Sequence, residues 1–366
     1  MRATVLLPLL LLFACVGGAP RAPADGTVAD DRSARDPFLG RAWEVAFVRP
    51  GTSLRGLCAV DAAAVWASGS RGTVLRSRDG GQTWTQVGPA DAADLDFRSV
   101  HAFDAERAVI CTAGQPARIY RTTDGGASWA VVHEDPRPEA FFDAVAFHGD
   151  RGLVVGDPID GALQVLASWD GGATWQPQVQ HAATATAPAA GEAMFAASGT
   201  CLVADHSVPD ERFWVVTGGS RSRSLRTDTL GGHWHTAALP LRQGEPSQGA
   251  FSVAFFDRRC GVAVGGDYRA PDVAEGTAAI SSDGGTSWTA VPGGALGYRS
   301  AVAALPDGRS CIAVGDGGTS VSRDRGASWQ PFGGEGFHAV AAVPGLVIAV
   351  GGAGRVGRLV PAAVRP

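Results

Sequence analysis

The 366-residue chain contains no lysine and no asparagine. The missing lysine excludes a phosphate-loop lysine and a Schiff-base nucleophile, and the missing asparagine excludes an Asn ligand and an N-glycosylation acceptor. All 31 basic residues are therefore arginines, which stand against 36 acidic residues for a formal net charge of -5. Because no run of arginines follows one face, we do not expect nucleic acid as a partner.

Cysteines and long apolar runs are also scarce. Beyond Cys15 an odd number of cysteines is spread over wide intervals, namely Cys58, Cys111, Cys201, Cys260 and Cys311. This pattern predicts no disulfide framework, and no Cys/His spacing typical of a metal site occurs, so we expect neither a metal nor a cofactor. No segment reaches the length of about 18 apolar residues that a membrane-spanning helix needs.

The N-terminus, MRATVLLPLLLLFACVGGAP, predicts a secretory signal over residues 1–20. Residues 12–15 also resemble a bacterial lipoprotein cleavage box, in which Cys15 would carry the lipid, although Phe13 is an unusual occupant. Lipidation and ordinary cleavage nearby both remain open. Residues 21–40 are polar, contain proline and predict a flexible tether. We therefore expect an exported, monomeric protein of the periplasm or cell envelope, lipid-anchored or else secreted.

Glycine and proline are abundant, with 50 and 22 residues, and separate short apolar runs, which favours an all-β fold. One short string recurs six times: SRDGGQTW at 77, TTDGGASW at 122, SWDGGATW at 168, TDTLGGHW at 227, SSDGGTSW at 281 and SRDRGASW at 322. Repeats of this length, with strand-length segments between turns, are typical of four-stranded propeller blades.

Six strings do not limit the fold to six blades. Three further strand-like segments follow Trp329, and a lone strand, RAWEVAFV, begins at Arg41. We predict that residues 41–366 form a seven-bladed β-propeller in which the N-terminal strand completes the last blade and leaves no open sheet edge.

Each string predicts a hairpin between the third and fourth strands of a blade. Its aspartate can accept hydrogen bonds from the turn, and its tryptophan can pack on the blade. The string resembles the Asp-box of BNR repeats, which occurs in sialidases and in many non-enzymatic propellers. The structural residues predicted in this way are Asp79, Asp124, Asp170, Asp283, Asp324, Trp84, Trp129, Trp175, Trp234, Trp288 and Trp329. The fourth string has Thr229 in place of the aspartate.

Binding residues are expected on the opposite face, where loops between second and third strands and loops between blades surround the channel mouth. Alignment of the inner strands places six residues at equivalent positions: Arg55, Arg98, Asp143, Ser252, Arg299 and His338. Arg55, Arg98 and Arg299, with the loop arginines Arg71, Arg221 and Arg269, suit an anionic ligand or an acidic protein loop. The structural alternative is that these arginines pair with carboxylates such as Asp96. Residues 184–199 predict an insertion over one face.

A glycoside hydrolase of sialidase-like architecture is the alternative function. Such chemistry needs a tyrosine nucleophile and carboxylates, for which the weak catalytic candidates are Tyr268, Asp267, Asp272, Asp157 and Asp160. Against it, the first blade reads LRGL where a sialidase has an aromatic-Arg-Ile-Pro motif, and no glutamate is clearly placed to support the tyrosine.

Two apparent motifs have simpler explanations. Residues 352–357 match GxGxxG, but only nine residues follow, which is too few for a dinucleotide-binding unit. His233 and His235 flank Trp234 of a repeat string without a carboxylate partner nearby, so they predict no metal site.

Longer strings carry a more specific resemblance. DFRSV, AVICTAG and IYRTTDGGASW resemble the photosystem II stability/assembly factor family of BNR propellers, and FFDAVAF, GLVVGDPIDG, GEAMFAASGTC and AVGGDYRAPD resemble its non-photosynthetic bacterial branch. The resemblance covers residues 41–360 and implies a non-catalytic protein whose arginine-bearing face binds a protein partner such as a membrane-protein assembly intermediate. Arg98 matches that face, whereas Asp143, Ser252 and His338 depart from it. Some relatives are labelled oxidoreductases, although this chain has no cofactor motif.

Overall fold

The computed structural model describes residues 36–178, 187–205 and 211–362. The predicted signal, the lipidation candidate Cys15, almost all of the predicted tether and residues 184–186 of the predicted insertion lie outside the described residues. Within the described part of the chain, no helix has the length and apolar character needed to cross a membrane.

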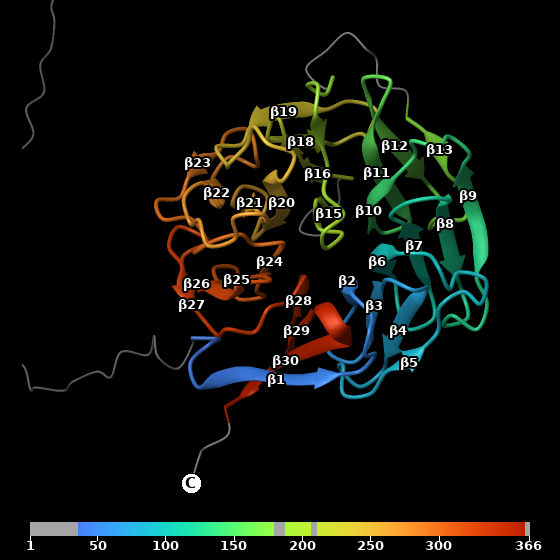
Figure 1. The fold of residues 1–366 in the computed structure, drawn as a ribbon, viewed down its shortest axis with the longest axis horizontal. Helices are drawn as coiled ribbons and strands as arrows, with labels where there is room; N and C mark the ends of the chain where they lie inside the picture. Colours follow the sequence, from blue (N-terminus) through green and yellow to red (C-terminus); the bar gives the residue numbers. More distant parts are fainter. Residues whose placement is uncertain (1–35, 179–186, 206–210, 363–366) are drawn as a thin grey trace, which may run out of the picture. The chain divides into compact units, whose positions relative to one another are not determined.

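Residues from Gly40 onward form seven antiparallel sheets arranged as blades around a central channel (Figure 1). Blade 1 consists of β2 (Leu54–Ala59), β3 (Val65–Gly69), β4 (Thr73–Ser77) and β5 (Thr85–Gln86). Blade 2 consists of β6 (Phe97–Ala102), β7 (Ala108–Thr112), β8 (Ala117–Thr122) and β9 (Ala130–Asp135). Blade 3 consists of β10 (Phe142–His148), β11 (Arg151–Ile159), β12 (Ala162–Ser168) and β13 (Gln176–Pro177). The predicted all-β seven-bladed propeller is confirmed.

The next three blades follow the same order from the channel outward. Blade 4 consists of β15 (Leu202–Ala204), β16 (Phe213–Val216), β18 (Arg223–Thr227) and β19 (His235–Ala238). Blade 5 consists of β20 (Gln248–Phe255), β21 (Gly261–Asp267), β22 (Ala278–Ser281) and β23 (Thr289–Ala290), extended at its inner edge by β17 (Gly218–Gly219) and β14 (Glu192–Ala193). Blade 6 consists of β24 (Ala301–Ala304), β25 (Cys311–Gly315), β26 (Gly318–Ser322) and β27 (Gln330–Pro331).

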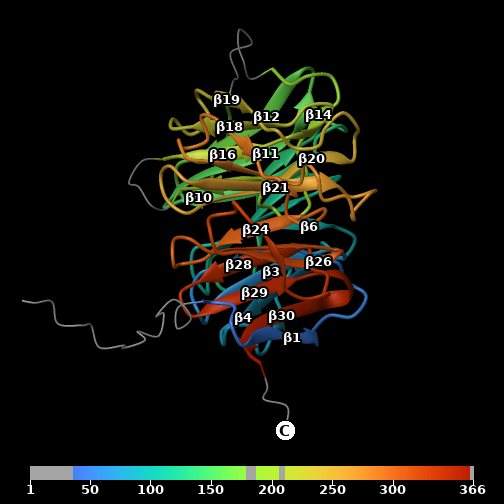
Figure 2. The same cartoon turned by 90° about the vertical axis from the view of Figure 1, so that its left-hand side faces the viewer.

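The N-terminal strand closes the ring as predicted. Blade 7 has the order β28 (Ala339–Val343), β29 (Leu346–Val350), β30 (Arg355–Pro361) and β1 (Arg41–Phe47) from the channel outward. The antiparallel pairing of β1 with β30 runs from Arg41 opposite Pro361 to Phe47 opposite Arg355, and the two strands lie side by side in both views (Figure 1; Figure 2). This pairing joins the two ends of the propeller and leaves no open gap between the first and last blades.

The GxGxxG match falls at this closure. Its first three residues form a single 3₁₀ turn, η2 (Gly352–Gly354), and its remainder enters β30, the last strand. These residues therefore form a turn and the strand of a blade, and not the strand–turn–helix of a dinucleotide-binding unit.

The repeat strings form the hairpins between third and fourth strands. Asp79 accepts hydrogen bonds from the backbone N–H of Thr83 at 2.9 Å and from its hydroxyl at 2.6 Å, and the Gly81 N–H donates to Ser77 Oγ at 2.8 Å. The strings at Asp124, Asp170, Asp283 and Asp324 repeat this arrangement.

The string tryptophans connect neighbouring blades as well as closing their own hairpins. The indole of Trp129 in blade 2 donates to the carbonyl of Val87 in blade 1 at 2.6 Å and stands edge-on to Trp66. Trp288 in blade 5 donates to Ser224 Oγ in blade 4 at 2.8 Å. Indole hydrogen bonds and ring contacts of these tryptophans therefore join blade 2 to blade 1 and blade 5 to blade 4.

Candidate functional site

The innermost strands aim side chains at one mouth of the channel through β-bulges. In blades 1, 2, 3 and 5 one extra residue stands where the first strand meets the second, namely Arg55, Arg98, Asp143 and Phe251. A bulge re-aims its extra side chain relative to the regular alternation of the strand. Three of these four positions are the ones expected from the sequence.

Two of the three remaining expected positions, those in blades 5 and 6, are shifted by one residue. The register of blade 5 places Phe251, not Ser252, at the bulge. In blade 6 the pairing of β24 with β25 puts Ser300 at the corresponding position, one residue after Arg299. The equivalence of Ser252 and Arg299 with Arg55 was therefore wrong, because a shift of one residue turns a side chain to the other face of a strand.

Arg299 consequently points into blade 6 and not into the channel mouth. Its guanidinium donates to Ser320 Oγ at 2.7 Å and to the carbonyl of Tyr298 at 2.8 Å, and its side chain is buried. Burial lowers the pKa of Arg299 to about 10. Arg299 is thus held by neutral acceptors inside the blade.

Residues 193–200, which we call the channel segment, pass through the channel between blades 3 and 4. Ser198 Oγ donates to the carbonyl of Ser300 at 2.9 Å, and Thr200 Oγ1 lies 2.7 Å from Ser252 Oγ. Gly199 adopts a φ of +72°, and a Cβ atom there would lie 2.7 Å from Ser99 Oγ. The described part of the predicted insertion therefore does more than cover a face, because it lies within the channel.

The channel segment separates two cavities. The first, of about 440 Å³, is bordered by the starts of the inner strands, and we call it the mouth cavity. Its charged lining residues are Arg55, Arg98, Asp143, Asp157 and Asp316. Its aromatic lining residues, which we call the aromatic wall, are Phe141, Phe195, Phe251, Tyr268 and Tyr298. Residues 193–197 of the channel segment complete the lining.

The two arginines of the mouth cavity differ in their partners. Arg98 Nε forms an ion pair with Asp96 at 2.7 Å. Arg55 donates to the carbonyl of Ala197 at 3.3 Å, and among the described residues no carboxylate lies within 4 Å of its guanidinium. Burial, and next the positive charge of Arg98, lower the pKa of Arg55. Arg55 is therefore a partly buried cation that no described carboxylate contacts directly, although the charges of Asp316 and Asp96 act on it from a greater distance.

Asp143 and Asp157 form an acidic pair in blade 3. Asp143 is 1% exposed, and neither of its carboxylate oxygens has a hydrogen-bond partner of good geometry. Burial, and next the nearby charge of Asp157, raise the pKa of Asp143 well above its usual range. Asp157 accepts a hydrogen bond from the Met194 N–H at 3.2 Å, and its own pKa is raised by burial. Both pKa values are therefore raised, and neither carboxylate has a cation within ion-pair distance among the described residues.

The third acid of the mouth cavity, Asp316, is compensated within the protein. Its Oδ1 lies 3.1 Å from His338 Nε2, and this hydrogen bond is the first cause of its lowered pKa. His338 Nδ1 in turn lies 3.0 Å from the carbonyl of Leu54. His338, which stands at the channel-mouth position of blade 7, thus ties blade 7 to blades 1 and 6.

The structure separates the catalytic candidates. Tyr268 and Asp157 both line the mouth cavity. Asp267 does not, because its carboxylate accepts from Gln248 Nε2 at 3.1 Å and from the Arg269 N–H at 2.9 Å. Asp160 and Asp272 are exposed outside the cavity, and no glutamate is among the residues that line it.

The remaining predicted arginines also lie outside the mouth cavity. Arg71 and Arg221 are exposed, and the Arg71 guanidinium reaches the carbonyl of Gly51 at 3.5 Å. The guanidinium carbon of Arg269 lies 5.9 Å from the centre of the Tyr268 ring. Of the six predicted binding arginines, the structure brings only Arg55 and Arg98 together in the lining of this cavity.

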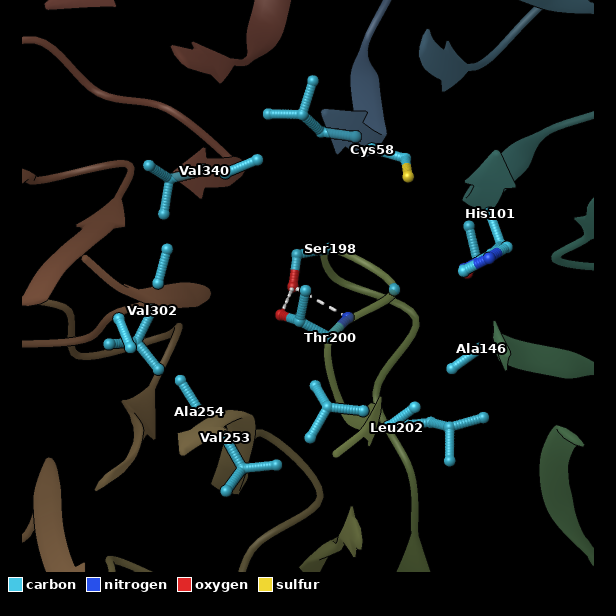
Figure 3. Close-up of a pocket in the computed structure, with 18 of the residues that line it drawn as sticks. Cys58, His101, Ala146, Ser198, Thr200, Leu202, Val253, Ala254, Val302 and Val340 are labelled. Atoms are coloured by element: carbon cyan, nitrogen blue, oxygen red, sulfur yellow. Dashed lines mark hydrogen bonds between the residues drawn. The ribbon is translucent and has the colours of Figure 1, made fainter. Parts of the chain in front are cut away.

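The second cavity, of about 420 Å³, lies toward the other ends of the inner strands and has a mainly apolar lining (Figure 3). Val253, Val302 and Val340 face it from three blades, with Cys58 and His101 on the opposite side (Figure 3). Ser198 and Thr200 of the channel segment stand between these walls and are hydrogen-bonded to each other at 2.7 Å (Figure 3).

Sequence reasoning missed several lining residues. Asp316 stands in a Gly-Asp pair directly after β25, and Asp157 stands in a Gly-Asp pair within β11, so this shared pattern could have indicated Asp316. Phe251 was missed because the bulge in blade 5 lies one residue earlier than the alignment assumed. Phe195 carries no such signal, because its position depends on how the channel segment packs.

Comparisons with known proteins support the fold. No protein family model matches the chain, and no curated protein matches it in sequence. The solved structure of YCF48 bound to D1 peptide is similar with a TM-score of 0.62 at 19% identity, covering 87% of this chain and 94% of that chain. YCF48 from Cyanidioschyzon merolae has a TM-score of 0.60 at 17% identity, with 88% and 100% covered.

Virginiamycin B lyase from Staphylococcus aureus is similar to the same degree, with a TM-score of 0.61 at 12% identity over 87% of this chain and 99% of that chain. Propellers described as a peptide-bound protein and as a lyase thus resemble this chain almost equally. The shared architecture therefore does not select a function, which has to be argued from the mouth cavity.

Proposed function

We propose that this chain is a non-catalytic, exported propeller that binds a protein partner by accepting an acidic group of that partner in the mouth cavity. The observation that carries the proposal is Arg55, a partly buried guanidinium in the cavity wall without a carboxylate partner among the described residues. Leaving such a cation uncompensated is unfavourable, and a carboxylate satisfies it with charge-assisted hydrogen bonds.

Two further features support a protein partner. The aromatic wall offers apolar surface next to Arg55, which suits a side chain flanking an acidic residue. The similar YCF48 structure was solved with a D1 peptide bound, so a propeller of this architecture has a precedent for peptide binding. Action outside the cytoplasm is part of the proposal and is supported by the N-terminal sequence of residues 1–20.

The proposal is tested by selecting peptides from a random library on the immobilised protein. We expect the selected peptides to be enriched in Asp and Glu, and Arg55→Gln to abolish this enrichment. Arg71→Gln is the matched control, because Arg71 is an exposed arginine of the same blade outside the cavity. Selection without acidic enrichment, or the same peptides selected by Arg55→Gln, would contradict the proposal.

A secreted glycoside hydrolase remains the second candidate, because Tyr268 and Asp157 line one cavity with Arg55. A hydrolase turns over fluorogenic glycosides and loses that turnover in Tyr268→Phe and in Asp157→Asn. A binding protein shows no turnover in any of these forms.

A further inference from the structure

The mouth cavity holds uncompensated charges of both signs. Arg98 is paired with Asp96, and Asp316 with His338. Arg55, Asp143 and Asp157 line the same cavity, and none of the three has an ion-pair partner among the described residues. Arg55 belongs to blade 1 and Asp157 to blade 3. Their charged atoms are more than 4 Å apart, so the two side chains do not form an ion pair with each other.

The two aspartates have different roles in this arrangement. Asp143 is buried and neither of its carboxylate oxygens has a hydrogen-bond partner of good geometry among the described residues, and burial, followed by the neighbouring charge of Asp157, raises its pKa. Asp157 is half-buried and lines the cavity, and its Oδ1 accepts a hydrogen bond from the Met194 N–H at 3.2 Å. Asp157 is therefore the carboxylate of this pair that a ligand cation reaches, because Asp143 is buried.

The aromatic wall favours a cation at the same place. Phe195 directly follows Met194, whose N–H binds Asp157, and both Phe195 and Asp157 line the mouth cavity. Phe195 stacks on Phe251, which stands edge-on to Tyr298 with ring centroids 4.9 Å apart. Ring faces attract ammonium groups, and they do so more strongly where water is displaced.

We propose that the mouth cavity takes an amphoteric ligand, whose carboxylate pairs with Arg55 and whose ammonium group pairs with Asp157 beside the aromatic wall. This inference rests on the proposed function for its carboxylate end and adds a cationic end to it. The ammonium group belongs either to a small zwitterion or to a basic side chain next to the acidic residue of a protein segment. A ligand of this kind compensates both unpaired charges at once.

Calorimetric titration of the full mature chain with matched probes tests the inference. The amphoteric probes are 4-aminobutyrate and 6-aminohexanoate, and butyrate and hexanoate are the same stems without the ammonium group. We expect one amphoteric probe to bind at least about tenfold more tightly than its carboxylate control, the gain of one charge-assisted hydrogen bond. N-acetyl-aspartyl-lysine amide, against the norleucine analogue, distinguishes a protein segment from a free zwitterion as the source.

Variants separate the two ends of the site. Asp157→Asn is expected to remove the gain from the ammonium group while leaving the affinity for hexanoate unchanged, and Arg55→Gln to weaken every probe. Asp160→Asn is the matched control, because Asp160 is exposed in the loop that follows β11, and a thermal unfolding curve shows that each variant is folded.

The outcomes of the two proposals are distinguishable. If hexanoate binds through Arg55 and the ammonium group adds nothing, the inference fails and the proposed function stands. If no probe binds, or binding does not depend on Arg55, both fail. An equal gain in wild type and Asp157→Asn also overturns the inference, because the ammonium group then lies elsewhere.

Discussion

Phe195 of the channel segment lies flat against Phe251 of blade 5, with ring centroids 3.9 Å apart and ring planes 3° apart. This stack connects a loop that has little regular structure to the bulge of an inner strand. It also forms part of the wall of the mouth cavity, so the shape of the cavity depends on it.

We expect Phe195→Ala to lower the free energy of unfolding by about 2 kcal/mol, less than the loss from a fully buried phenylalanine because Phe195 is half-buried. Urea unfolding followed by tryptophan fluorescence measures the change. Trp169→Ala, which removes a ring that is 42% exposed, is the control and should cost little. Equal losses in the two variants would show that the stack contributes no specific stability.

Substitution of Arg299 is expected to lower the free energy of unfolding much more than substitution of Arg55. Arg299→Ala removes the donors that satisfy Ser320 Oγ and the Tyr298 carbonyl in a buried site, so the free energy of unfolding should fall by about 3 kcal/mol. Arg55→Ala removes one long hydrogen bond and a repulsion with Arg98, so its loss should stay below about 1 kcal/mol.

Binding of the acidic peptides provides the second readout for this pair. Arg299→Ala should keep the affinity once the temperature is low enough for it to be folded, because Arg299 does not line the mouth cavity. Arg55→Ala should lose the affinity. Peptide binding that depends on Arg299 and not on Arg55 would place the binding site elsewhere.

The hydrogen bonds of the repeat strings predict a shift in titration. The Thr83 hydroxyl is the first cause that lowers the pKa of Asp79 to about 2, and Ser128 does the same for Asp124. We expect Thr83→Val to raise the pKa of Asp79 toward its usual value. The carboxylate carbon resonance of Asp79, followed over a pH series, measures this change. The pKa of Asp124 in the next blade should stay about 2 and is the internal control.

The sign of the accompanying stability change follows from linkage. A carboxylate with a lowered pKa stabilises the fold above its unfolded pKa, and this contribution disappears as the pH falls through the folded pKa. The stability difference between wild type and Thr83→Val should therefore shrink between about pH 4 and about pH 2. A difference that is constant over this range would mean that the hydroxyl acts without the charge of Asp79.

The sequence predicted the blade architecture because the same turn chemistry recurs in five of the six repeat strings. Hydrogen bonds join Asp79 to Ser77 and to Thr83 within a span of seven residues, so no distant contact is needed to infer the hairpin. The closure by β1 was also predictable, since a lone strand at one end of the chain and three strands at the other complete one blade.

The mouth cavity was less predictable because it depends on register and on long-range packing. A single bulge decides whether Phe251 or Ser252 faces the channel, and inner strands as short as Ala301–Ala304 do not show this in their residue pattern. The position of Phe195 depends on a segment that no repeat constrains. These are the residues that sequence alignment of the blades misplaced or missed.

The acidic pair of blade 3 gives the last prediction. A carboxyl group whose folded pKa lies above its unfolded pKa destabilises the fold as the pH rises, because the unfolded chain releases the proton first. Asp143 is such a group, with Asp157, Arg98, Cys111 and Cys201 as the titratable neighbours that act on it or respond to it.

We therefore expect Asp143→Asn to be more stable than wild type at neutral pH, with an advantage that disappears below about pH 4. Urea unfolding over a pH series measures this difference, and Asp160→Asn, an exposed acid of the same blade, should show no such trend. An Asp143→Asn variant that is equally stable or less stable at every pH would mean that the fold stabilises the charged form of Asp143, so that both aspartates of blade 3 would carry a negative charge.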